Sequence, residues 1–195
     1  MSDYWPDLAS ISIERYFGML AERELMPGRR PLKQNLSDHL RLLQGRGITD
    51  LAVLKEAIRT KPRLKQFAQM SGLAEEWLVL LWREIQALNP KPAPIGRFPR
   101  VRVQVADAMA RAGIKDSKLL FERVAEQGIP ALAQELGLKE EDVTEVYAMS
   151  DLVRIYGVGP VFARIMVDGG IRSTSDLAGR EAGPLFADLV KWSAG

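Results

Sequence analysis

A short glycine-containing sequence, Gly157-Val158-Gly159-Pro160, is the clearest local sequence signal in the chain. The preceding residues predict a helix, and proline is favoured at the first position of a second helix, where its missing N–H costs no hydrogen bond. Such a turn leaves backbone N–H groups unpaired at a helix N-terminus, and these groups form an anion site. We therefore interpret Gly157, Val158 and Gly159, with Arg164 nearby, as candidate nucleic-acid-binding residues. The alternative is a tight packing turn without a ligand.

Two degenerate copies of this layout precede it and carry more positive charge. The candidate binding residues of the first copy are Gly28, Arg29, Arg30 and Lys33, and those of the second are Gly96, Arg97, Arg100 and Arg102. Arginine and lysine beside a helix start are a better electrostatic arrangement for phosphate than glycine alone. The sequence therefore predicts phosphate contacts at these two copies before the better-formed third one.

Charge is distributed unevenly, although the net charge is only +2. Residues 27–66 hold ten basic and three acidic side chains, and residues 91–118 hold seven and two. Residues 119–151 reverse the sign, with two basic and eight acidic side chains. The basic stretches favour a polyanionic partner, and the acidic stretch favours a basic one. The alternative is that all three are solvated helix faces.

Known catalytic and metal-binding patterns are missing from the sequence. There is no cysteine, which excludes disulfides and cysteine metal sites, and His39 is the only histidine. The acidic residues at 140–142 and 145 are typical of a helix start, where carboxylates complement the helix dipole. The glycines at 157 and 159 lack the third glycine of a dinucleotide-binding loop, because Phe162 stands there. We expect no enzyme activity, no cofactor and no metal.

The elements that position these residues are predicted to be helices. Apolar residues recur at helical spacing in nearly every segment between glycines and prolines, for example at Leu36, Leu40 and Leu43. Residues 101–105 alternate as a strand would, but they lead directly into the strongly helical Ala106–Ala110. We predict helix throughout this segment and an all-α fold.

The chain also repeats itself. A Gly-Ile landmark at residues 47–48 recurs at 113–114, 66 residues later, and a Gly-Leu landmark at 72–73 recurs at 137–138, 65 residues later. A third Gly-Ile copy stands at 170–171. Each Gly-Ile landmark predicts the end of one helix at a left-handed glycine and the start of another. The expected caps of the new helices are Thr49, Asp116 and Thr174.

The repeat predicts tandem helix-hairpin-helix-like units in two related helical halves of about 65 residues each. Residues 90–94 contain three prolines, which favour an extended linker. We place the boundary there, with an N-terminal half at 1–90 that holds the first degenerate hairpin. The C-terminal half, at 91–195, holds the second degenerate hairpin and the Gly-Val-Gly-Pro hairpin.

The segment from Asp151 to Ile171 resembles the helix-hairpin-helix motif, whose pattern is glycine, an apolar residue, glycine, often proline, and then alanine. The resemblance implies that the hairpin amides and the second helix hold a nucleic-acid phosphate, usually through the minor groove and without reading sequence. A basic residue commonly follows the proline in DNA-binding versions of the motif. Val161 and Phe162 stand at that place in this chain.

The chain from about residue 12 to 180 also resembles an uncharacterised bacterial family, domain of unknown function 4332. The resemblance rests on residues 25–32, 82–85, 151–155 and 157–164. It implies a helical fold of the helix-hairpin-helix kind and brings no established activity.

Two functional hypotheses follow from the sequence. The first is a non-enzymatic, cytoplasmic protein that contacts the phosphate backbone of nucleic acid non-specifically, with DNA and RNA both open. The second is a protein–protein interaction or scaffold module in which the hairpins only pack helices and the acidic stretch meets a basic partner. We expect no membrane association, and the oligomeric state stays open.

Overall fold

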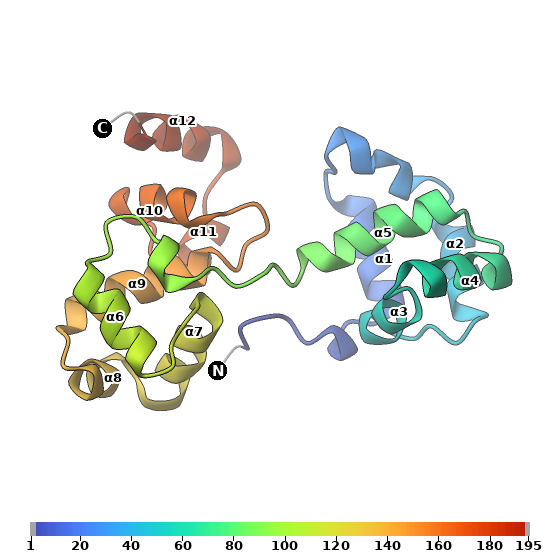
Figure 1. Cartoon of the computed structure of the whole chain (residues 1–195). Coiled ribbons are helices and arrows are strands. Elements are labelled where there is room, and N and C mark those ends of the chain that lie inside the picture. The colour runs from blue at the N-terminus through green and yellow to red at the C-terminus, as the bar shows by residue number, and fades with distance from the viewer. Residues whose placement is uncertain (1–2, 194–195) are drawn as a thin grey trace. The chain divides into compact units, whose positions relative to one another are not determined.

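The protein is all-helical in the computed structural model, which describes residues 3–193 except for the side chains of residues 182 and 193. Figure 1 draws coiled ribbons and loops over this range and no strand arrow, as the sequence predicts. No described helix combines the length and apolar character that a membrane crossing needs. The chain divides into two units, one of Pro6–Leu88 and one of Asn89–Gly195 together with Met1–Trp5. Residues 1–2 and 194–195 of the two expected halves lie outside the described part.

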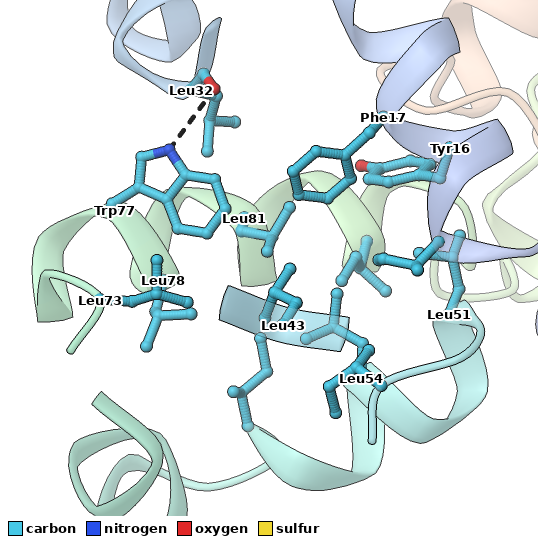
Figure 2. Packing of buried hydrophobic residues seen from close by; sticks show 14 of the residues in the cluster. Tyr16, Phe17, Leu32, Leu43, Leu51, Leu54, Leu73, Trp77, Leu78 and Leu81 are labelled. Atoms are coloured by element: carbon cyan, nitrogen blue, oxygen red, sulfur yellow. Dashed lines mark hydrogen bonds between the residues drawn. The ribbon is translucent and has the colours of Figure 1, made fainter. Parts of the chain in front are cut away.

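The N-terminal unit packs its helices around one apolar core. Its elements are η1 (Leu8–Ser10), α1 (Ile13–Glu22), η2 (Pro27–Lys33), α2 (Leu36–Gln44), α3 (Leu51–Ala57), α4 (Lys61–Ser71) and α5 (Glu75–Ala87). Figure 2 shows Leu43 of α2, Leu54 of α3 and Leu81 of α5 converging, and all three are fully buried. The Trp77 indole donates a hydrogen bond to the Leu32 carbonyl at 3.4 Å, which ties α5 to η2.

The C-terminal unit is built around α9. Its elements are η3 (Ile95–Arg97), α6 (Val103–Arg111), α7 (Ser117–Gln127), α8 (Ile129–Leu136), α9 (Glu140–Leu152), α10 (Pro160–Asp168), α11 (Thr174–Ala178) and α12 (Ala182–Ser193). Helix α9 packs against α7, α8 and α10, and residues 148–152 are buried without a break at its C-terminal end. The C-terminal end of α9, which leads into the turn before α10, is therefore fixed in the interior of this unit.

The first described residues of the chain pack on the C-terminal unit, which the sequence did not predict. The Tyr4 hydroxyl shares a 2.7 Å hydrogen bond with the buried Ser117 hydroxyl, and the Trp5 indole donates to the Pro90 carbonyl at 3.1 Å. The Arg154 guanidinium donates to the Tyr4 carbonyl at 2.7 Å and to the Asp3 carbonyl at 3.0 Å. The chain thus leaves this unit after Trp5 and returns to it at Asn89.

The three Gly-Ile landmarks share one backbone geometry. The glycines are left-handed, with φ of 77° at Gly47, 81° at Gly113 and 85° at Gly170. Each isoleucine N–H bonds to the carbonyl five residues earlier, in the pairs Ile48–Leu43 (3.2 Å), Ile114–Met109 (2.8 Å) and Ile171–Met166 (2.9 Å). This 6→1 bond is the Schellman ending of a helix, which glycine favours because it has no Cβ.

A short backbone bridge also recurs in both units. In the N-terminal unit the Ile13 N–H bonds to the Thr49 carbonyl at 3.0 Å, and the Leu51 N–H bonds to the Ile11 carbonyl at 3.1 Å. In the C-terminal unit the Ile95 N–H bonds to the Lys115 carbonyl at 3.1 Å, and the Ser117 N–H bonds to the Ala93 carbonyl at 2.8 Å. The two units therefore present the same bridge immediately before α3 and before α7.

The observed caps correct two of the three expected ones by one residue. Asp50 and not Thr49 caps α3, with a carboxylate oxygen 2.9 Å from the Val53 N–H, and Ser173 and not Thr174 caps α11. Asp116 caps α7 as expected. The Thr49 carbonyl is occupied by the backbone bridge, so the next residue takes the extended conformation from which a side chain reaches the first turn.

The start of α6 corrects the prediction of helix from Val101 onward. Helix α6 begins at Val103, and Arg102 is its extended N-cap, with φ −62° and ψ 140°. Pro99 disfavours a helical residue before it, and Arg100 is left-handed with φ 61°. The chain therefore turns at residues 99–100, and the helix begins only after the turn.

Candidate nucleic-acid interface

The hairpin between α9 and α10 is an exposed turn of a few residues. The Val158 N–H bonds back to the Ile155 carbonyl at 3.0 Å, and Gly157 is left-handed with φ 89°. Gly159 is extended and precedes Pro160, the first residue of α10. Both glycines are exposed, whereas Val158 is partly buried and packs against the core of the C-terminal unit.

The hairpin leaves several backbone N–H groups without a partner. Within the described part of the chain, the amides of Gly157, Gly159, Val161 and Phe162 make no hydrogen bond. The Ala163 N–H is the first in α10 with an acceptor, the Gly159 carbonyl at 2.9 Å. Exposed, unpaired amides at a helix N-terminus attract an anion, because they add to the positive end of the helix dipole.

The elements on either side of the hairpin are anchored by buried residues. Ala163 is fully buried and follows the exposed residues of the first turn of α10. The nearly buried Asp151 accepts hydrogen bonds from the Arg154 guanidinium at 2.5 Å and from the Thr174 N–H at 2.7 Å. These bonds join the end of α9 to α11, so the hairpin is supported on a rigid base.

Two cationic side chains line the same hollow as the hairpin. The hollow has a volume of about 290 Å³ and is formed by residues 90–94, Arg97, Val153, Ile155 and residues 157–160. Lys91 and Arg97 line it, both are exposed, and neither side chain has an ion pair or hydrogen bond among residues 3–193. Their charges are therefore free for an anion that reaches the amides of Gly157 and Gly159.

The other arginines of the C-terminal candidate set are already paired with carboxylates. Arg100 bonds to Asp168 at 3.1 Å, and Arg102 bonds to Asp142 at 2.5 Å. Arg164 pairs with both Glu145 and Asp168, and its hydrogen bond holds the pKa of Asp168 below its usual value. These pairs neutralise much of the positive charge that Arg100, Arg102 and Arg164 would otherwise present to a ligand.

The N-terminal candidate set does not form a comparable hairpin. Arg29 is largely buried and bonds to Glu84 at 2.9 Å, and the Lys33 ammonium donates to the Ala21 carbonyl at 2.9 Å. Arg30 alone in this set is an exposed cation without a partner in the described chain. Arg29 is therefore neutralised by a carboxylate, whereas Arg30 and Lys33 keep their charges.

Gly28 and Gly96 do not provide the predicted glycine turns. Both lie inside 3-10 turns, η2 and η3, and neither has the positive φ seen at Gly157. A hairpin with a left-handed glycine thus forms at the third copy and not at the two degenerate ones. This geometry favours the third copy as the candidate phosphate site, whereas the sequence favours the two basic copies.

Two features of the interface were missed at the sequence level. Lys91 was counted in a basic stretch but was not connected with the hairpin about 66 residues later. The exposed aromatic side chains of Tyr156 and Phe162 also border the free amides. Tyr156 adjoins the first glycine and Phe162 lies two residues after the proline, so their positions in the motif were the available signal.

The described residues define an all-helical protein with an exposed glycine hairpin in its C-terminal unit. Residues 99–194 match the model of a family described as Domain of unknown function (DUF4332), and through this half the chain belongs to that family. No curated protein and no solved structure matches the chain. The matched range contains α6 to α12 and the hairpin, whereas Lys91 and Arg97 precede it.

Proposed function

We propose that the protein binds the phosphate backbone of nucleic acid non-specifically, without catalysing a reaction, through the hairpin between α9 and α10. The observation that carries the proposal is that unpaired amides of Gly157 and Gly159 border the same hollow as the free cations Lys91 and Arg97. Amides at a helix N-terminus and nearby cations are the two features that phosphate sites combine.

The charges around α10 also favour the approach of a polyanion from the hairpin side of this helix. A second hollow, of about 520 Å³, is lined by the acidic Glu140, Glu141, Glu145 and Asp168 and by the basic Arg164 and Arg172. A polyanion is repelled by this excess of carboxylates, so it meets α10 from the hairpin. Two free cations predict weak binding with a shallow salt dependence, a slope of log K against log salt of about −1.4 to −1.8, because the slope scales with the number of phosphates neutralised.

Fluorescence anisotropy with labelled random-sequence DNA at low salt tests the proposal. Arg97→Ala should weaken binding and lower the slope of log K against log salt by about 1, because one phosphate contact is lost. Arg111→Ala is the matched control, since Arg111 is also exposed but does not line the hollow. Equal slopes for the two variants, or no binding by the wild-type protein, would contradict the proposal.

Gly159→Ala tests the amides separately from the charges. Gly159 has φ −90°, which alanine adopts, and no atom lies within 4 Å of the position of an added Cβ. We therefore expect unchanged folding by circular dichroism. The added methyl group stands beside the free amides, so affinity should fall several-fold while the salt slope stays the same. Unchanged affinity would mean that these amides do not contact the ligand.

A protein–protein interaction module is the second candidate, and the acid-lined hollow beside α10 favours it. Four carboxylates face two guanidinium groups there, so a basic segment of a partner protein has complementary charge. Affinity capture from lysate with and without nuclease separates the two functions. A partner that persists after nuclease treatment favours the interaction module, and loss of all partners favours nucleic acid.

A further inference from the structure

We propose that the hairpin prefers unpaired nucleic acid, whose bases stack on Tyr156 and Phe162 while its phosphates bind the free amides. The inference rests on the phosphate site proposed above and adds the class of strand that it binds. Stacking of a base on an aromatic side chain tightens single-strand binding about 5- to 150-fold per base and tolerates any sequence.

Large apolar side chains are concentrated in the exposed part of the hairpin. The exposed fractions are 59% for Tyr156, 61% for Val161 and 51% for Phe162. Single exposed apolar residues are common on protein surfaces, but three within seven residues, interleaved with unpaired amides, indicate a contact surface. Two of the three are aromatic, and an aromatic ring offers a base a flat face of matching size.

The position of Phe162 on α10 keeps it away from the acid-lined hollow. Phe162 and Arg164 are two residues apart, so they project about 200° apart around the helix axis. Arg164 points to Glu145 and Asp168, which line that hollow. Phe162 therefore lies on the flank that carries no ion pair, and a strand that stacks on it avoids the carboxylates.

The same surface is poorly suited to a duplex. The bases of a duplex already stack on one another, and an inserted side chain must separate a base step at a cost of a few kcal/mol. Val161, directly after Pro160, supplies no cation to offset that cost, and Lys91 and Arg97 are the two free cations in the hollow. An unpaired strand presents phosphates and open base faces together without this cost.

Anisotropy with three probes of equal length tests the inference on the full chain. The probes are a single-stranded oligothymidylate (the thymidine strand), a mixed-sequence duplex and an abasic single strand that keeps the phosphates but has no bases. We expect the thymidine strand to bind at least 5-fold tighter than either other probe. Phe162→Ala and Tyr156→Ala should each weaken thymidine binding about 5-fold or more, the lower end of the stacking range, and leave abasic binding unchanged.

Phe186→Ala is the matched control, because Phe186 is a phenylalanine of α12 with 69% of its surface exposed. It should leave binding of all three probes unchanged. Duplex binding that is as tight as thymidine binding, or a Phe162→Ala variant that binds thymidine normally, overturns the stacking inference and leaves the phosphate site standing. Failure of the wild-type protein to bind any of the three probes at low salt overturns the phosphate site itself.

Discussion

Arg29 holds η2 against α5, and its replacement by alanine should destabilise the N-terminal unit. Its guanidinium donates to the Glu84 carboxylate at 2.9 Å and to the Leu80 carbonyl at 3.3 Å. The side chains of Arg29 and Glu84 are only 17% and 10% exposed. The pKa of the neighbouring Tyr16 is raised, first by burial and then by the charge of Glu84. The Glu84 carboxylate thus lies in the interior and depends on its arginine partners.

The loss of stability in Arg29→Ala depends on how well the remaining Glu84 charge is compensated. Removing one partner of a buried ion pair costs about 3–5 kcal/mol, because the other charge stays buried without compensation. Arg23 also pairs with Glu84, but 49% of its side chain is exposed, so Arg23 compensates the Glu84 charge only in part. We therefore expect a loss of about 2–3 kcal/mol. For a unit of this size the corresponding fall in Tm is about 10–20 °C.

Thermal unfolding followed by circular dichroism measures this loss. The matched control is Arg30→Ala, since Arg30 is the next residue and is an exposed cation without a partner in the described chain. Its Tm should stay within 2–3 °C of the wild-type value, as is usual for surface positions whose effects are within about 0.5 kcal/mol. The double variant Arg29→Ala, Glu84→Gln should recover part of the loss, because it also removes the buried charge. Equal Tm values for Arg29→Ala and Arg30→Ala would refute the reasoning.

Two further predictions concern buried polar groups. Burial lowers the pKa of His39, so below about pH 6.5 the unfolded chain binds more protons and the N-terminal unit loses stability as the pH falls. His39→Phe removes this pH dependence between pH 8 and 5, and a denaturation series in which both proteins change alike would contradict the assignment. Tyr4→Phe deletes the 2.7 Å hydrogen bond to Ser117 and should lower the stability of the C-terminal unit by about 1 kcal/mol. Urea unfolding measures this change, and an unaltered midpoint would mean that the Tyr4–Ser117 hydrogen bond does not stabilise that unit.

The turn between α9 and α10 could be predicted from the sequence because its causes are local. Proline can begin a helix but not continue one, and Gly157 has the positive φ that other residues avoid. The same local rules predict the Gly-Ile helix ends at residues 47–48, 113–114 and 170–171. They fail at Gly28 and Gly96, because these glycines adopt ordinary conformations within 3-10 turns.

The availability of each cation could not be predicted from the sequence. Arg29 lies 55 residues from Glu84, Arg100 lies 68 residues from Asp168, and Arg102 lies 40 residues from Asp142. Only folding brings these carboxylates within reach. A count of basic residues in a window therefore overstates the charge that a ligand can use.

The sequence by itself determined the all-helical class and the helix ends at left-handed glycines. Those properties depend on backbone sterics and on apolar spacing, which act over a few residues. Only the tertiary structure decided that Lys91 and Arg97 stay unpaired beside the hairpin and that Tyr4 packs on Ser117. Charge pairing and burial depend on which distant segments meet, and no short stretch of sequence contains that information.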